Sequence, residues 1–292
     1  MKIKVTKMHG CGNDFVIVDY EEYIKIGNSF SDFAKNICDR NFGVGADGLI
    51  IPKLEKFKSG ADIGWYFYNS DGSTAQMCGN GMRCFAKYVY DNKILDKKVF
   101  TVETGAGMIK PELLDNGLVK VNMGNPILED KRIPFKGERK LNILDKTFDI
   151  TPVSMGNPHC VIFIDDEPYK YAKKYGRHIE CHPNFPEKTN VEFVRIKSDN
   201  EIDLCVYERG CGITLACGTG ACASVIAGVL NNMLTHNVKV NLPGGTVFVE
   251  WQGTQTNTEK NVFLTGPCKY SFKAEYEYDI KPYFNYNKFL EV

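Results

Sequence analysis

The sequence has no excess of charge of either sign. Lys and Arg together number 36, and so do Asp and Glu, so the formal net charge is zero when the histidines are neutral. It contains no long basic run, which is the electrostatic footprint that a nucleic-acid-binding protein needs. It also has no apolar run long enough to cross a bilayer. These absences argue against nucleic acids and membranes as partners and favour a small-molecule ligand.

The sequence also lacks the signs of export and of a metal site. Its first residues, MKIKVTKMHGCGNDF, show no apolar core of a signal peptide, so we expect a cytoplasmic protein. Eleven cysteines are present, an odd number, which favours reduced thiols over a disulfide framework. There is no Cys-x-x-Cys pair, and the spacing of Cys205, Cys211, Cys217 and Cys222 does not match a structural zinc site. No metal ligand is predicted.

What the chain does contain is a succession of short strands. At 292 residues, its length suggests two domains. Short alternating or apolar runs between Gly, Asn, Asp and Pro predict the strands. They cover residues 2–8, 14–20, 47–52, 63–69, 99–104, 118–123, 159–165, 190–196, 202–208, 238–242, 246–251 and 261–266. A polar surface loop is predicted around His178 and His182.

Two similar stretches, QMCGNGMRCFA at 76–86 and LACGTGACASV at 215–225, each run into a predicted helix directly after their CGNG or CGTG. Met82, Phe85, Ala86 and Val89 recur at the spacing of one helix face. The second stretch continues into a segment that is apolar nearly all round, which is typical of a buried helix wrapped by a sheet. Cys84 and Cys222 fall on these helices and are predicted to lie in the core.

The two stretches belong to a longer internal repeat. Asn69 and Glu208 each precede the cysteine of their motif by nine residues, at the ends of similar strands. Further upstream, CGNDFVIVD at 11–19 is similar to MGNPHCVIFID at 155–165. A duplication on this scale predicts two similar domains that face each other. Clefts between domains are favoured ligand sites, so we expect both cysteines at one interdomain site.

The repeated helix starts suggest a chemistry. Glycine lets a ligand approach the backbone closely, and the amide groups of a first helical turn carry the positive end of the helix dipole. A carboxylate suits this position, and we expect the same field to lower the pKa of a cysteine there. Two opposed motifs would place a sulfur on each face of the carbon next to a bound carboxylate. This arrangement suits inversion of that carbon, with one thiolate removing a proton and one thiol returning another.

Several motifs together resemble the diaminopimelate epimerase family: HGCGNDFVIVD, MCGNGMRCFA, MGNPHCVIF, TNVEFV, YERGCGITLACGTGACAS and LTGP. They run in order from about residue 3 to about residue 275. The resemblance implies cofactor-independent interconversion of LL- and meso-diaminopimelate, in lysine and peptidoglycan-precursor synthesis, by a homodimer. It implies an α/β (mixed α+β) fold of two pseudo-symmetric domains, each a curled, mostly antiparallel sheet around a central helix. We expect one domain from residues 1–123 plus 266–292, with Cys78, and one from 124–265, with Cys217.

The resemblance also implies roles for particular residues. Cys78 and Cys217 match the catalytic acid/base pair. His159 matches a supporting residue that helps to keep a thiol poised. Gly48 stands where some members have a side-chain amide that reaches the substrate, so here that contact is expected from the backbone or not at all. The matched substrate contacts are Gly79, Asn80, Gly218 and Thr219 at the reacting carboxylate, Glu208 near the α-amino group, and Asn13, Asn69, Asn157, Asn190 and Arg209, mostly at the distal end.

Alternatives stay open at this point. Proline racemases and hydroxyproline epimerases have Met-Cys-Gly-His where this chain has Met-Cys-Gly-Asn, and a small cyclic substrate has no distal charge for Arg209 to bind. A non-enzymatic protein with a regulatory disulfide is the third hypothesis. Asn13 and Asn157 could simply cap turns, and Glu208 and Arg209 could be a solvated pair at a strand end. The role of the aromatic tail at 278–292 is not predicted.

Overall fold

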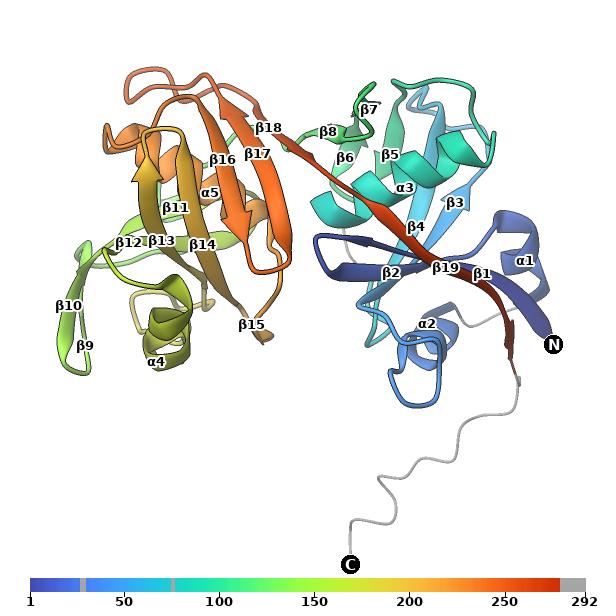
Figure 1. Cartoon of the computed structure of the whole chain (residues 1–292), viewed down its shortest axis with the longest axis horizontal. Coiled ribbons are helices and arrows are strands. Elements are labelled where there is room, and N and C mark those ends of the chain that lie inside the picture. Colours follow the sequence, from blue (N-terminus) through green and yellow to red (C-terminus); the bar gives the residue numbers. More distant parts are fainter. Residues whose placement is uncertain (27–29, 75–76, 279–292) are drawn as a thin grey trace, which may run out of the picture.

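The computed structural model describes residues 1–26, 30–74 and 77–278. These residues form two lobes, and each lobe contains a curved sheet and a central helix (Figure 1). The tail from residue 279 onward lies outside the described residues. No helix in the described ranges is both long and apolar enough to cross a membrane. The two lobes follow the predicted duplication, and each motif begins the central helix of its lobe.

The first sheet has seven strands in the order β19-β1-β2-β3-β4-β5-β6. The neighbours β2 and β3, and also β4 and β5, are parallel, and the remaining pairs are antiparallel. The strands are β1 (Lys2–Gly10), β2 (Asn13–Ile17), β3 (Gly48–Lys53), β4 (Ile63–Asn69), β5 (Val102–Thr104), β6 (Gly107–Ile109) and β19 (Lys269–Glu277).

The second sheet has ten strands in the order β11-β12-β13-β14-β16-β17-β18-β8-β7, with β15 beside β14. Only β12–β13 and β14–β16 are parallel. The strands are β7 (Pro111–Leu113), β8 (Val119–Asn122), β11 (Thr151–Ser154), β12 (Pro158–Phe163), β13 (Asn190–Ser198), β14 (Glu201–Glu208), β15 (Gly212–Ile213), β16 (Asn237–Leu242), β17 (Gly245–Trp251) and β18 (Val262–Gly266); β9 (Lys140–Ile143) and β10 (Lys146–Asp149) form a separate hairpin.

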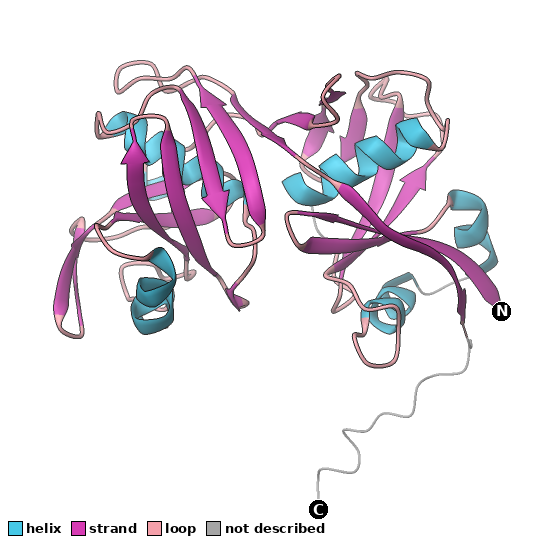
Figure 2. Ribbon diagram, in the orientation of Figure 1, coloured by secondary structure: helices cyan, strands magenta, loops and turns pink. Residues whose placement is uncertain are grey.

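The two central helices are α3 (Gly79–Asp91) and α5 (Gly218–Leu230), and each begins at the residue after the cysteine of its predicted motif. Figure 2 shows one such helix beside the strands of each lobe. Helix α5 is buried on almost every side, and so is α3 over its first three turns. Each helix lies in its own apolar core, with Cys84 in one and Cys222 in the other. The expectation of a mixed, mostly antiparallel sheet curled around a central helix in each lobe is confirmed.

The outer face of each sheet is covered by helices that the sequence analysis missed. Helices α1 (Tyr20–Ile26) and α2 (Phe30–Cys38) cover the first sheet, and α4 (Pro168–Glu180) covers the second. A short 3-10 turn, η1, spans Asp130–Arg132. The predicted surface loop is wrong at His178, which lies on the exposed face of α4, whereas His182 does lie in the loop that follows the helix. Within α4, a side chain at Gly176 would meet the Tyr207 ring at 2.4 Å, so glycine there allows the helix to pack closely on β14.

The chain passes between the lobes at two places, one at β8 and the other between β18 and β19. Strand β8 pairs with β18 of the second sheet, yet its Val119 and Val121 pack in the core around α3. Immediately after β18, the chain enters β19, which pairs with β1 in the first sheet. We propose the division into residues 1–123 plus 266–292 and residues 124–265, which places these two crossings at the boundaries.

The lobes also interlock through a tight turn. The turn between β1 and β2 places Cys11 against the hairpin between β16 and β17, so the Cys11 side chain lies in the core of the second lobe. A side chain at Gly244 of this hairpin would lie 1.9 Å from the Cys11 carbonyl oxygen. Only glycine fits here, because the obstacle is backbone on both sides.

We therefore predict that Gly244→Ala destabilises the protein by about 3 kcal/mol, the upper range for overpacking. Gly117→Ala is the matched control, because no atom lies within 4 Å of its side-chain position and its φ of +80° strains any alanine. The control should lose only about 1 kcal/mol. Thermal unfolding of both variants measures the difference, and equal losses would show that the interlock is loose.

Candidate active site

Cys78 and Cys217 occupy the same position in the two lobes, the residue that caps the start of a helix. The backbone N–H of Gly81 donates to Cys78 Sγ at 3.4 Å, and the N–H of Gly220 donates to Cys217 Sγ at 3.4 Å. Both cysteines have extended backbone and precede their helices, α3 and α5. The two motifs thus use sulfur where a helix cap usually has an oxygen acceptor.

The two helix starts lie next to each other. Side chains at Gly79 and Gly218, the first residues of α3 and α5, would each meet the same methyl group, Cδ2 of Leu264, at 3.3 and 3.1 Å. The side-chain amide of Asn80 donates to the carbonyl of Ala216 at 3.3 Å, which links the motifs directly. The structure therefore brings the two predicted catalytic cysteines to one region between the lobes.

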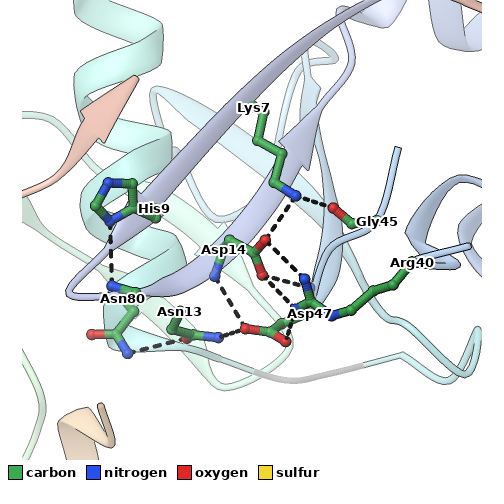
Figure 3. A network of polar contacts seen from close by, with 9 residues as sticks. Lys7, His9, Asn13, Asp14, Arg40, Gly45, Asp47 and Asn80 are labelled. Carbon is green, nitrogen blue, oxygen red and sulfur yellow. Dashed lines mark hydrogen bonds and ion pairs between the residues drawn. The ribbon is translucent and has the colours of Figure 1, made fainter. Parts of the chain in front are cut away.

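Around Cys78, predicted asparagines form a connected set. The thiol of Cys78 lies 3.6 Å from Asn13 Oδ1, and the amide of Asn80 donates to the same oxygen at 3.1 Å. Asn13 in turn donates to a carboxylate oxygen of Asp47 at 2.7 Å, and Arg40 pairs with Asp47 at 2.8 Å (Figure 3). Asn13 is therefore held by side chains on two sides and is more than a turn cap.

The carboxylate beside this set is anchored as well. Asp14 pairs with Lys7 at 2.7 Å and with Arg40 at 2.9 Å (Figure 3). Although burial acts to raise the pKa of Asp14, its bonds to Arg40 and Lys7 lower it overall. These charges fix the turn that carries Asn13.

Around Cys217, a chain of polar contacts leads away from the sulfur. Cys217 Sγ lies 3.5 Å from the Thr219 hydroxyl, to which the Asn157 amide donates at 3.4 Å. His159 Nε2 lies 3.0 Å from Asn157 Oδ1, and Nδ1 lies 2.7 Å from a Glu192 carboxylate oxygen. His159 and Glu192 are fully buried, so the predicted supporting histidine reaches Cys217 through two intervening side chains.

Glu208 lies at the end of β14 and influences both sulfurs. The Thr214 hydroxyl donates to its carboxylate, and its negative charge raises the pKa of both Cys78 and Cys217. Burial raises the pKa of Glu208 itself, and contacts with Thr214 and the Cys217 thiol act in the opposite direction. Glu208 therefore lies close enough to act on both sulfurs and is not a solvated strand end.

The pKa of each thiol is raised, although the sequence analysis expected a helix start to lower it. The amide donors do favour the thiolate, but loss of water outweighs them and raises the pKa of both cysteines. The pKa of Cys217 is raised furthest, because the carboxylates of Glu208 and Glu192 add to the effect of burial. The Arg83 guanidinium acts to lower the pKa of Cys78 but not that of Cys217.

The hydrogen bonds of the remaining predicted contacts, Arg209, Asn190 and Asn69, lead to groups other than the two sulfurs. Arg209 is exposed; its backbone N–H donates to Asn190 Oδ1 at 2.9 Å, and its guanidinium donates to the Glu187 carbonyl at 3.2 Å. Asn190 is buried and also donates to the Pro158 carbonyl at 2.9 Å. Asn69 ends β4 and donates to the Ser73 hydroxyl at 2.9 Å, so its amide bonds within its own turn.

Three charged residues of this region were not singled out from the sequence: Asp47, Arg83 and Glu192. Glu192 lies within TNVEFV and Arg83 within MCGNGMRCFA, so both were inside quoted motifs without an assigned role. The signal that could have identified Arg83 and Glu192 is a charged residue within an otherwise apolar helix or strand. Gly48 begins β3 and has no room for a side chain, because Phe67 and the Tyr68 carbonyl would each lie 2.8 Å away.

Most of the other cysteines are buried. All eleven are free, and of the nine besides Cys78 and Cys217 only Cys181 and Cys211 are exposed. Within the described ranges, no group of three or more His, Cys, Asp or Glu side chains is arranged to hold a metal ion.

Comparison with solved structures supports the fold. A phenazine biosynthesis protein of the PhzF family from Bacillus anthracis is similar with a TM-score of 0.70 at 17% identity, over 94% of this chain and 99% of that one. A hydroxyproline epimerase from Agrobacterium vitis gives a TM-score of 0.66 at 13% identity, over 94% and 92%. At such low identity these likenesses show the architecture alone.

Comparison with known sequences identifies the family. The model of the family described as diaminopimelate epimerase matches residues 5–129 and 151–271. The diaminopimelate epimerases of Carboxydothermus hydrogenoformans and Halothermothrix orenii are 49% and 46% identical to this chain, over 92% of it and over 98% and 96% of their own lengths. The resemblance found in the motifs is thus confirmed across both halves, and the chain belongs to the diaminopimelate epimerase family.

Proposed function

We propose that the chain interconverts LL- and meso-diaminopimelate by a two-base mechanism in which Cys78 and Cys217 act on opposite faces of one α-carbon. The observation that carries this proposal is the pair of cysteine-capped helix starts on either side of Leu264. Inversion requires one group to remove a proton and another to deliver one from the far side. A single base on one face cannot do both without moving.

The reacting carboxylate is proposed to bind at the two helix starts. The first amide groups of a helix have no partner within it, and they carry partial positive charge. Gly79 and Asn80 on one side and Gly218 and Thr219 on the other supply such groups close together. When the α-proton leaves, charge moves onto this carboxylate, so the same donors stabilise the carbanion.

The proton transfers balance without an added group. One cysteine, as thiolate, takes the α-proton and becomes a thiol, while the other gives its thiol proton to the opposite face and becomes a thiolate. No electrons are gained or lost, and the resting state is restored when the two sulfurs exchange a proton with solvent or other groups. A cofactor is therefore not required by the chemistry.

The distal end of diaminopimelate is itself an amino acid, so it needs charged and amide partners. Arg209 is exposed on the turn after β14 and can grip a carboxylate with two parallel bonds. Asn157 and Asn190 lie on the same lobe, and Asn190 holds the backbone of Arg209. Asn13, Asn69 and Glu208 are proposed to complete the binding of the amino groups, with His159 supporting the Cys217 side.

We predict that Cys78→Ser and Cys217→Ser keep the fold but lower turnover at least about 100-fold, because a hydroxyl ionises far less readily than a thiol. Alanine at either position should abolish turnover. Cys181→Ser is the matched control, since this cysteine is exposed at the end of α4 and should leave kcat unchanged. Rates near the native value in either catalytic variant would refute the two-thiol mechanism.

A second prediction concerns substrate binding. Arg209→Lys should raise KM about tenfold or more and alter kcat much less, because lysine cannot form the bidentate bond. Arg195→Lys is the control, as Arg195 pairs with Asp203 away from the cysteines. Steady-state kinetics with LL-diaminopimelate give both constants. An unchanged KM would remove Arg209 from the substrate site.

The experiment that tests the proposed function is direct. The purified, reduced protein is incubated without cofactor with LL-diaminopimelate and, separately, with L-proline, and the stereoisomers are separated by chiral chromatography. Formation of meso-diaminopimelate supports the proposal. Racemisation of proline alone would assign the chain to a different substrate. If the protein turns over neither substrate while all its thiols are free, it has the fold of the family but not the proposed activity.

We further propose that the chain acts in the cytoplasm as a homodimer. The cysteines support the location, because their number is odd and all eleven are free in the structure. The family resemblance supports the dimer. Analytical ultracentrifugation should give twice the chain mass of 32.9 kDa, and a monomer at micromolar concentration would contradict it.

A further inference from the structure

Glu180 is the last residue of helix α4, and its side chain is fully buried. This is a costly place for a carboxylate, because burial removes its water and the C-terminus of a helix carries partial negative charge. Arg177, one turn earlier, pairs with it at 2.6 Å but is itself 63% exposed. A partner that lies in solvent does not account for a carboxylate that lies inside, so the reason must come from another contact.

That contact is with the turn after β14. Glu180 Oε1 accepts a hydrogen bond from the backbone N–H of Gly210 at 2.8 Å. Although burial acts to raise the pKa of Glu180, the bonds from Gly210 and Arg177 lower it overall, so the group is held as a carboxylate. A hydrogen bond to an ionised acceptor is about twice as strong as one between neutral groups.

The preceding amide of the same turn is also held by a side chain. The N–H of Arg209 donates to Oδ1 of the buried Asn190 at 2.9 Å, and Asn190 itself donates to the Pro158 carbonyl. Gly210 has a φ of +79°, a conformation that favours glycine. Two consecutive amides therefore face buried acceptors on α4 and β13, and this sets where the Arg209 side chain leaves the backbone.

The corresponding turn of the first lobe is held differently. Counted back from the two motif cysteines, Ser70 corresponds to Arg209, and the Ser70 N–H donates to a backbone carbonyl, that of Asp47, at 3.1 Å. Helix α2 contacts this turn through the Ser31 hydroxyl, which donates to the Gly72 carbonyl at 2.8 Å. The second lobe, whose turn carries the arginine, uses side-chain acceptors in place of the backbone carbonyl.

We propose that Glu180 is a positioning residue for substrate binding: through the Gly210 amide it fixes the turn from which Arg209 reaches the distal carboxylate of diaminopimelate. The inference rests on the proposed function and extends it, because it makes helix α4 a support of the substrate site. Glu180 does not touch the substrate itself. It holds the turn in place before binding, so less conformational freedom is lost when Arg209 grips the carboxylate.

Loss of this contact should affect binding more than proton transfer. Glu208 is held independently by the Thr214 hydroxyl and by its pairing with Gly212 of β15. The turn can therefore loosen at Gly210 while the end of β14 stays in place beside the sulfurs. The expected result is a higher KM with a kcat close to the native one.

The first measurement needs no substrate. Amide hydrogen exchange, read by mass spectrometry with fragmentation to single residues, reports how firmly each N–H of the turn is held. Glu180→Ala should speed exchange of the Gly210 amide about tenfold or more. Glu22→Ala is the matched control, because Glu22 is a buried glutamate on α1 that pairs with Lys25 and accepts from the Lys4 amide. The control should leave the Gly210 rate unchanged.

Steady-state kinetics with LL-diaminopimelate then test the link to binding. Glu180→Ala should raise KM about fivefold or more and change kcat less than about twofold. In an Arg209→Met background the same substitution should raise KM no further, since its effect runs through that arginine. An equal rise in both backgrounds, or an equal rise for Glu22→Ala, would show a general structural effect and overturn the proposal.

Two conservative variants separate reach from charge, and they decide the matter if the alanine variant does not fold. Glu180→Gln keeps an acceptor oxygen for Gly210, because the exposed Arg177 can turn into water, so the exchange rate and KM should stay near the native values. Glu180→Asp keeps the charge but is one methylene shorter, so both quantities should rise. The reverse order of these two variants would contradict the proposal.

The outcomes also distinguish this role from the proposed function. If the native protein does not turn over diaminopimelate, the function and the role of Glu180 both fall. If diaminopimelate is turned over but the Gly210 amide exchanges at the same rate in every Glu180 variant, the function stands and the positioning role is refuted.

Discussion

The structure depends on one contact, the meeting of two helix N-termini from different lobes. A carbon can be inverted by proton transfer only if groups stand on both of its faces, and a duplicated fold provides two similar groups facing each other. Leu264 lies between the first glycines of α3 and α5, and Asn80 bonds to Ala216 across the junction. Larger residues at those glycines would push the helix starts apart, so the motif spacing and the reaction are linked.

Bringing the helix starts together also creates the main electrostatic difficulty. Packing removes water from both sulfurs and raises the pKa of each thiol, which opposes the thiolate that the reaction needs. In both halves the helix amides counteract part of this rise in pKa, since the N–H groups of Gly81 and Gly220 donate to the sulfurs. The charges beyond that layer are not duplicated, because the Glu192 carboxylate acts on Cys217 and not on Cys78.

The sequence predicted those parts of the molecule that repeat. The cysteines, the central helices and the strands of the repeated motifs could be found because two halves with the same pattern support each other, whereas β19, which lies outside the repeat, was missed. Helix α4 was missed because Tyr, Lys and Gly176 give a weak apolar pattern, although its buried face is continuous. Arg83, Asp47 and Glu192 were missed because a buried charge is justified only by neighbours from distant segments, as Arg83 is by Gly10, Gly266 and Pro267.

Proton NMR in D2O tests the two-base account most directly. LL-diaminopimelate is added to the protein, and the α-proton signals of substrate and product are followed during the first few per cent of conversion. If two thiols act from opposite faces, the meso product carries deuterium at the inverted carbon from the start, while the remaining LL substrate stays fully protonated. Deuterium appearing in the substrate as fast as in the product, or a product that keeps its proton, would contradict the mechanism.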